Sequence, residues 1–173
     1  MYEWVQQLTV RLLRPGASIP DPDRIAASEL QQHASSFIST GLQPPSIQFS
    51  RNWLYCRRAA SLNAEYLPGV HSVRVCLNLI QSEEDLAGAL ARELSWMTAT
   101  CKGLPASDAA VARAVVFSCK AEIARVADLD APSRDEGVRV CAQIYLKRKL
   151  PNASKRQIDT WHFYTRQLIQ ENS

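Results

Sequence analysis

Long hydrophobic runs are missing from this chain of 173 residues. Apolar residues make up 46% of the sequence, yet no stretch of them approaches the ~20 residues that a membrane-spanning helix needs. A chain of this length and composition can bury one sizeable core. We therefore expect one main domain that is soluble or peripheral to a membrane.

A strong excess of one charge is also lacking. The formal net charge is +3, and charged residues make up 21% of the chain. This excess is too small to require nucleic acid as a partner, and none is expected. The opening segment, MYEWVQQLTVRLLRPG, has no apolar signal core and carries an early acidic residue, so neither a secretory signal nor a cleavable presequence is expected. It predicts either an amphipathic helix that docks on a partner or membrane, or a first helix that covers the core.

Closely spaced metal ligands are absent as well. The five cysteines are 18 to 25 residues apart with no Cys-x-x-Cys, which argues against a zinc ribbon or a thioredoxin-type site. Two disulfides and a free thiol would suit an oxidising compartment, whereas five buried thiols would suit a reducing one, and both remain open. His33, His71 and His162 lie in different predicted elements, so no metal or other cofactor is expected. The candidate disulfide cysteines are Cys56, Cys76, Cys101, Cys119 and Cys141.

The best-defined predicted element is a helix over residues 82–100. Ser82 and Asp85 form the Ser-x-x-Asp pattern of a capping box at its start. At about 100° per residue, its apolar side chains share one stripe, with Glu93 at the edge beside Ala89 and Trp96. The residues of the stripe are Leu86, Leu90, Leu94, Met97 and Cys101.

The remaining pattern predicts a mostly helical α+β fold. Further helices are expected over residues 23–40, 107–128, 132–150 and 154–171, the first ended by Gly41. Apolar residues alternate with polar ones over residues 46–50, 53–57 and 73–78, around a turn at 67–69, which predicts a small antiparallel sheet. We divide the chain into an N-terminal helical extension, 1–44, and a main domain, 45–173.

Two acidic residues face the predicted core. Glu93 borders the apolar stripe of its helix, and Glu122 lies within that of the next. Because an unpaired buried charge costs several kcal/mol, each needs a partner, of which Arg92, Arg113 and Arg125 are the nearest in sequence. A salt bridge between the helices is the simplest expectation, since oxygen-only sites of two carboxylates bind Zn²⁺ poorly.

The residues around Glu93 have the spacing of a zinc-peptidase helix. In those enzymes two histidines four residues apart bind Zn²⁺, and the glutamate after the first acts as general base on the metal-bound water. Here the glutamate is present, but Arg92 and Trp96 occupy the two histidine positions. Neither side chain offers a lone pair to a metal.

Cations cluster between the last two predicted helices. Five of them fall within ten residues, a density that suits acidic protein, anionic lipid head groups or RNA. A solvated helix end, where cations favour the helix dipole, is the more frequent explanation of such a cluster. These docking candidates are Lys147, Arg148, Lys149, Lys155 and Arg156.

The order of several segments resembles one protein family. The segments RNWLYCR, NAEYLPGVHSVRVCLNLI, DLAGALAREL, SCKAEIARVADLD and EGVRVCAQIYLKRKLPNASK are similar to the mitochondrial inner-membrane zinc metallopeptidases that help assemble ATP synthase. The matching positions occur in the family's order, over about 120 residues between 47 and 168. They are Cys76 with Asn78, Glu93 with Leu94, Cys119, Glu122 with Ile123, and Cys141.

This resemblance implies a zincin-like fold that has lost its zinc site. The family's closing acidic segment is not recognisable, one extra residue separates Cys119 from Glu122, and Arg92 and Trp96 replace the metal-binding histidines. The resemblance therefore implies an inactive, metallopeptidase-like accessory subunit or assembly factor of a mitochondrial inner-membrane complex, either the respiratory chain or ATP synthase. It also implies a peripheral location on the intermembrane-space side, with Trp96 and an ion pair of Arg92 or Arg125 with Glu122 filling the old cleft.

Two other functions remain as alternatives. A metal-independent hydrolase would use Glu93 and Glu122 as general acid and base, which requires both carboxyl groups to share an open cleft. A mitochondrial matrix protein that associates with RNA or the ribosome would use the basic cluster and keep its cysteines reduced.

Overall fold

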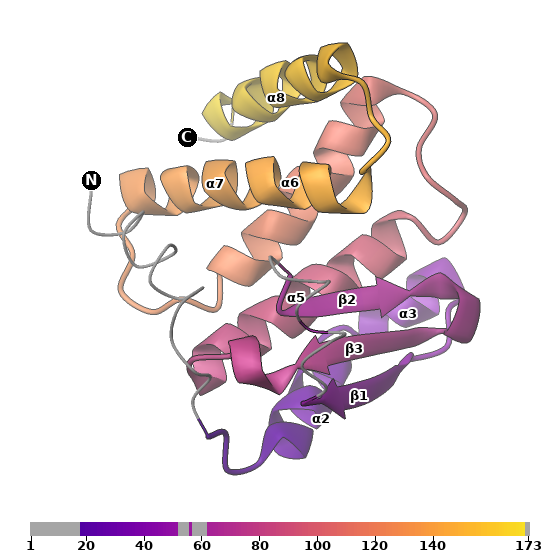
Figure 1. Ribbon diagram of the computed structural model, residues 1–173, viewed down its shortest axis with the longest axis vertical. Helices are drawn as coiled ribbons and strands as arrows, with labels where there is room; N and C mark the ends of the chain where they lie inside the picture. Colours follow the sequence, from indigo (N-terminus) through magenta and orange to yellow (C-terminus); the bar gives the residue numbers. More distant parts are fainter. Residues whose placement is uncertain (1–17, 52–55, 57–61, 172–173) are drawn as a thin grey trace.

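The computed structural model describes residues 18–51, 56 and 62–171. It confirms a mostly helical α+β fold with one three-stranded sheet. Figure 1 shows the sheet on one side of helix α5 and the helices α6, α7 and α8 on the other. The predicted N-terminal segment, 1–17, lies outside the described residues.

Two helices replace the single one expected over residues 23–40 of the N-terminal extension. Helix α2 spans Pro22–Gln32, capped by the Asp21 side chain, and α3 spans Ala34–Thr40. The break is at His33, whose ring Nδ1 lies 2.9 Å from the carbonyl oxygen of Glu29. Gly41 ends α3 in the left-handed conformation, as predicted.

The sheet is mixed, so the prediction of an antiparallel sheet was wrong. Strand β1 spans Ser46–Ser50, β2 Ala64–Leu67 and β3 Ser72–Cys76, in the order β1-β3-β2. Strand β3 pairs antiparallel with β2 and parallel with β1. Alternation marks a strand but not its direction, and the long connection from β1 permits the crossover that parallel pairing needs. Apart from Cys56, the strand predicted over 53–57 lies outside the described residues.

The turn between β2 and β3 lies where it was predicted. A 3₁₀ turn, η1, spans Pro68–Val70 and is followed by His71 in the left-handed conformation. The Nε2 of His71 lies 2.8 Å from the carbonyl oxygen of Gln43, which can only accept, so Nδ1 accepts from the Tyr66 hydroxyl at 3.0 Å. The ring thus ties the hairpin to the loop before β1. A second 3₁₀ turn, η2, covers Leu77–Leu79.

Helix α5, Glu83–Ala99, joins the two halves of the molecule. The Ser82 hydroxyl accepts from the Asp85 N–H, confirming the cap, although the Asp85 carboxylate accepts from Gln81 rather than from Ser82. Its stripe is buried, except that Cys101 lies beyond the helix end and is exposed. One face of α5 joins the sheet, α2 and α3 in a first core cluster, while Trp96 joins the helical cluster of α6, α7 and α8.

Three capped helices complete the fold. Helix α6 spans Asp108–Ile123, α7 Ala131–Lys149 and α8 Lys155–Gln170. Their caps are the side chains of Ser107, Asp130 and Ser154, the last in a full capping box. Helix α6 ends at Ile123, so it is shorter than the helix predicted over residues 107–128. Among the described residues, no helix is both long and apolar enough to cross a membrane.

Candidate functional site

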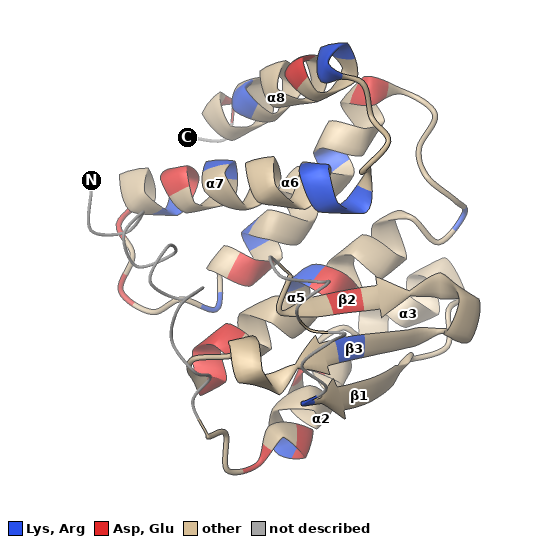
Figure 2. Cartoon of the chain, viewed as in Figure 1, with Lys and Arg blue, Asp and Glu red and all other residues tan. Residues whose placement is uncertain are grey.

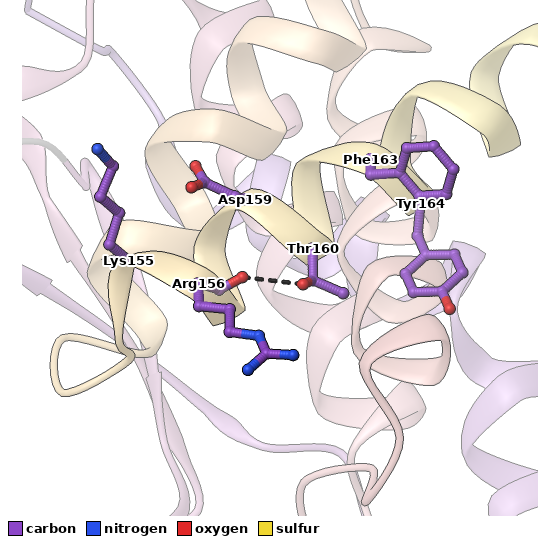
Figure 3. Close-up of a pocket in the computed structure, with 6 residues that line it drawn as sticks. All are labelled: Lys155, Arg156, Asp159, Thr160, Phe163 and Tyr164. Atoms are coloured by element: carbon purple, nitrogen blue, oxygen red, sulfur yellow. Dashed lines mark hydrogen bonds between the residues drawn. The ribbon is translucent and has the colours of Figure 1, made fainter.

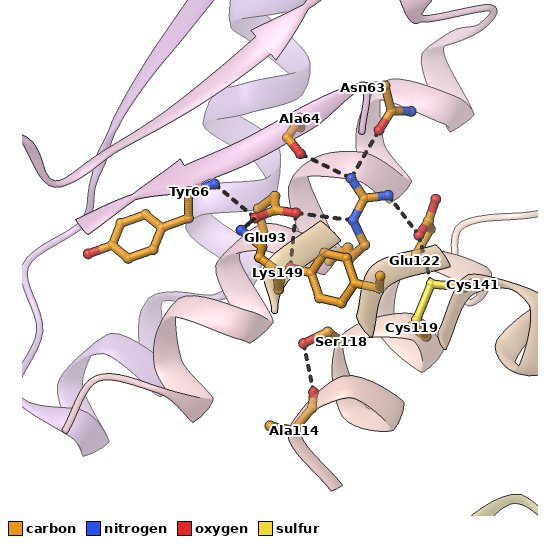
Figure 4. Close-up of polar contacts among 12 residues, drawn as sticks. Asn63, Ala64, Tyr66, Glu93, Ala114, Ser118, Cys119, Glu122, Cys141 and Lys149 are labelled. Atoms are coloured by element: carbon orange, nitrogen blue, oxygen red, sulfur yellow. Dashed lines mark hydrogen bonds and ion pairs between the residues drawn. A yellow bond between two sulfur atoms is a disulfide. The ribbon is translucent and has the colours of Figure 1, made fainter. Parts of the chain in front are cut away.

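Glu93 is the centre of a buried polar network between the sheet and the helices (Figure 4). Its side chain is 0% exposed. The carboxylate accepts hydrogen bonds from the backbone N–H of Tyr66 at 2.8 Å, Lys149 Nζ at 2.9 Å, the Tyr145 hydroxyl at 3.0 Å and Arg92 Nε at 3.2 Å. Four donors from β2, α5 and α7 therefore saturate this one group.

The Arg92 guanidinium extends the network to α6. Its Nη1 donates to Glu122 Oε2 at 3.0 Å, and its Nη2 donates to Asn63 Oδ1 at 3.0 Å and to the carbonyl oxygen of Ala64 at 3.3 Å. Together with the bond from Nε to Glu93, each nitrogen of the guanidinium has an acceptor. Arg92 thus bridges two carboxylates and the edge of the sheet, with the planar geometry that arginine provides.

The charges in this network balance. Burial by itself raises the pKa of Glu93, but Lys149 and Arg92 outweigh that effect and hold the pKa below its ordinary value. Burial lowers the pKa of Arg92 while Glu122 and Glu93 raise it, with a net rise. Burial, and then Glu93, raises the pKa of the Tyr145 hydroxyl well above normal. At neutral pH Glu93 is therefore a carboxylate, Arg92 a guanidinium cation and Tyr145 a neutral phenol.

Aromatic rings close the site where the second histidine of a zinc motif would lie. Trp96 meets Tyr145 edge to face, with ring centroids 5.4 Å apart. Lys149 Nζ lies 5.9 Å and 5.5 Å from these two centroids, and the guanidinium carbon of Arg92 lies 5.3 Å from that of Tyr145. The cations are thus held by ring faces as well as by carboxylates.

Gly88 allows α6 to approach α5 closely at this point. A Cβ at position 88 would lie 3.2 Å from the carbonyl oxygen of Glu122 and 3.3 Å from its Cγ. Both contacts are tighter than ordinary packing, so a larger residue would push Glu122 away from Arg92. A glycine in a helix interior costs up to ~1 kcal/mol relative to alanine, and close approach is its physical reason here.

Two disulfides bracket the network. Cys56 is bonded to Cys76 at the end of β3, and Cys119 on α6 is bonded to Cys141 on α7. The Sγ of Cys141 lies 3.3 Å from Glu122 Oε2; as a bridged sulfur it has no hydrogen to donate, so this is a packing contact. Four of the five candidate cysteines are thus paired.

The sequence candidates divide into those that meet here and those that do not. Arg92, Glu93, Trp96 and Glu122 come together, and the ion pair of Arg92 with Glu122 is present as expected. The Arg125 guanidinium does not pair with the Glu122 carboxylate, although the Arg125 backbone N–H donates to the carbonyl oxygen of Glu122 at 3.0 Å. The guanidinium donates to Glu29 on α2 at 2.7 Å and 2.9 Å, joining positions 96 residues apart.

Sequence reasoning missed Glu29 and misplaced Lys149. Glu29 follows Ile25 by one helical turn on the buried face of α2, and that spacing is the signal that would have found it. Lys149 was predicted to belong to the docking surface, but its side chain is only 8% exposed and points to Glu93. A lysine side chain at the end of a helix can extend into solvent or fold back onto the protein. Here it folds back, because the buried carboxylate of Glu93 accepts its hydrogen bond.

Neither carboxylate of this network is without an ion pair. Glu93 is fully buried, and both it and Glu122 are bonded to Arg92, so the open cleft that a two-carboxylate hydrolase needs is not formed by these two groups. A guanidinium also repels a cation at the position between them. In the described part of the chain, no group of three or more His, Cys, Asp and Glu side chains gathers as a metal site.

Comparisons with known proteins add no family assignment. No family model, curated protein or solved structure matches the chain.

Proposed function

We propose that this protein is a catalytically inactive, zincin-like relative of the metallopeptidases it resembles, and that it serves as an accessory subunit or assembly factor of a mitochondrial inner-membrane complex. The single observation that carries this proposal is the position of Arg92. Its guanidinium lies between Glu93 and Glu122, the two acidic positions that match the family, and forms an ion pair with each. A site closed in this way has a structural role rather than a hydrolytic one.

The two disulfides support the intermembrane-space side of the inner membrane as its location. Disulfides persist in oxidising compartments and are rare where thiols are kept reduced. The Cys56–Cys76 and Cys119–Cys141 bridges therefore favour this location over the mitochondrial matrix. For the same reason they favour an accessory subunit over an RNA-associated matrix protein.

The docking surface of this proposal is the basic corner, which we define as Lys147, Arg148, Lys155 and Arg156. All four side chains belong to exposed residues, and Figure 2 shows basic residues at the end of α7 and at the start of α8. On α8, Lys155 and Arg156 also line a shallow hollow of about 530 Å³ (Figure 3), where Phe163 is half exposed. Cations beside an exposed aromatic ring suit an acidic subunit surface or anionic lipid head groups.

The test is affinity purification of the endogenous protein from mildly solubilised mitochondrial membranes, with zinc determined on the same sample. We expect stoichiometric recovery of a respiratory-chain or ATP-synthase complex without zinc. One zinc per chain with no stable complex would overturn the proposal.

A matched pair of variants tests the docking surface. Lys147→Gln with Arg148→Gln removes two cations from the basic corner, and we expect it to reduce recovery of the complex. Arg113→Gln with Lys120→Gln removes two exposed cations from α6 and should leave recovery unchanged. Equal recovery with both pairs would show that the basic corner is not the docking surface.

A further inference from the structure

A second, polar pocket lies between α7 and α8, apart from the hollow in Figure 3. Its volume is about 350 Å³, at the lower end of the range for small-ligand sites. Two arginines, one from each helix, line it together with polar side chains. The lining residues are Arg139, Gln143, Asp159, His162, Thr165 and Arg166.

The electrostatics of this pocket favour an anion. Burial lowers the pKa of His162, and the cations Lys147, Arg166 and Arg139 lower it further, against the opposing effect of Asp159. Three cations and one carboxylate therefore act on this ring. The Nε and Nη2 of Arg139 donate to the Glu136 carboxylate. The third nitrogen of that guanidinium, Nη1, takes no part in these two bonds.

Thr165 gives the pocket an unused hydrogen-bonding group. The residue is 2% exposed, and its hydroxyl has no hydrogen-bond partner. A buried hydroxyl in a helix ordinarily donates to the carbonyl four residues earlier, as Ser118 does to Ala114. A buried polar group without a partner calls for an explanation, and a bound oxyanion supplies one.

We propose that the α7–α8 pocket binds a phosphate group, held by the guanidinium groups of Arg139 and Arg166 and by the hydroxyl of Thr165. Gln143 and His162 add further polar groups on the same walls. A phosphate has enough oxygens and charge to engage this many donors, whereas a carboxylate has only two oxygens. Asp159 lines both this pocket and the hollow beside it, and its negative charge opposes the attraction of the two arginines for an anion.

The direct test follows the ring of His162 by NMR while inorganic phosphate is added to the full-length, oxidised protein. A bound phosphate dianion favours the imidazolium, so the pKa of His162 should rise. Sodium chloride at matched ionic strength is the control, because salt alone screens the neighbouring cations. No response to phosphate beyond that of chloride would overturn the proposal.

Three variants locate the binding. Arg166→Gln removes a charged donor and should weaken phosphate binding about tenfold or more. Thr165→Val keeps the shape of a buried side chain and should weaken binding by a smaller factor. Arg113→Gln removes the same charge from an exposed position on α6, outside the pocket and the basic corner, and should leave binding unchanged. Equal weakening by Arg113→Gln and Arg166→Gln would refute a defined site.

Vesicles distinguish the source of the phosphate. We would measure binding to phosphatidylcholine vesicles with and without phosphatidic acid. If the ligand is a lipid head group, phosphatidic acid should recruit the protein, and Arg166→Gln or free phosphate should abolish that recruitment. If the ligand is a free anion, Arg166→Gln should weaken phosphate binding in solution without affecting vesicle binding. Insensitivity of both assays to Arg166→Gln would contradict the site.

Discussion

Replacing Glu93 by glutamine is the most direct test of the buried network. Glutamine has nearly the same shape, but it removes the charge that faces Lys149 and Arg92. Arg92 keeps Glu122 as a partner, whereas Lys149 is left beside a neutral amide and two aromatic rings. Breaking a buried ion pair from one side typically costs about 3–5 kcal/mol, and we expect Glu93→Gln to lose stability in that range.

The measurement is urea unfolding of the oxidised protein at pH 7, followed by tryptophan fluorescence and analysed by linear extrapolation. Glu83→Gln is the matched control on the same helix, because its ion pair with Arg24 is exposed; it should cost less than about 1 kcal/mol. A loss below about 0.5 kcal/mol for Glu93→Gln, the range of ordinary surface substitutions, would refute a charged, buried Glu93.

A double variant identifies which cation depends on Glu93. Lys149→Met removes the charge and keeps an apolar side chain of similar length. If Lys149 is the partner left stranded, Glu93→Gln with Lys149→Met should be more stable than the sum of the two single losses predicts, by about 1–3 kcal/mol. Additive losses would contradict a direct coupling between the two side chains.

Three further predictions concern pH and the links between elements. The folded state lowers the pKa of Glu93, so ionised Glu93 should stabilise the fold fully above its ordinary pKa of 4.5 and progressively less as the pH falls below that value. The loss of stability at acid pH should therefore be smaller in Glu93→Gln than in the wild-type protein. Replacing Cys119 and Cys141 by alanine removes a disulfide that joins positions 22 residues apart, and it should lower the free energy of unfolding by about 3 kcal/mol. An unchanged urea midpoint would contradict this disulfide. Glu29→Gln should lower the free energy of unfolding by about 2 kcal/mol, because it weakens the bonds to Arg125. A loss as small as that of Glu83→Gln, whose ion pair is exposed, would contradict a buried ion pair at Glu29.

Local signals in the sequence were sufficient to locate the helices, but not the break at His33 or the end of α6 at Ile123. Ser82, Ser107 and Ser154 act as N-caps because their hydroxyls accept from backbone groups only three residues away. Gly41 ends a helix through its own backbone conformation. The apolar stripe of α5 was also readable from its spacing, although the structure buries residues outside that stripe as well, among them Ala91, Arg92 and Ser95.

Long-range pairing was beyond those signals. The period of two marked β1 and β3 as strands, but it is the same for parallel and antiparallel neighbours. The partner of Arg125 lies on α2, 96 residues away, so proximity in sequence favoured the wrong carboxylate. In the sequence Lys149 is one of several consecutive basic residues, and only its contact with the Glu93 carboxylate on another helix distinguishes it from its exposed neighbours.

The balance of charge explains why Arg92 and Glu93 occur together. If the proposed descent from a zinc site is correct, loss of the metal would leave two inward carboxylates, Glu93 and Glu122, without a cation. The buried guanidinium of Arg92 restores a positive charge between them and is planar enough to bond both at once. Lysine at position 92 would carry the same charge but only three donors on one nitrogen, so it could not also reach Asn63 and Ala64 as the guanidinium does. The geometry of the donor, and not its charge alone, is what holds the sheet edge, α5 and α6 together at this point.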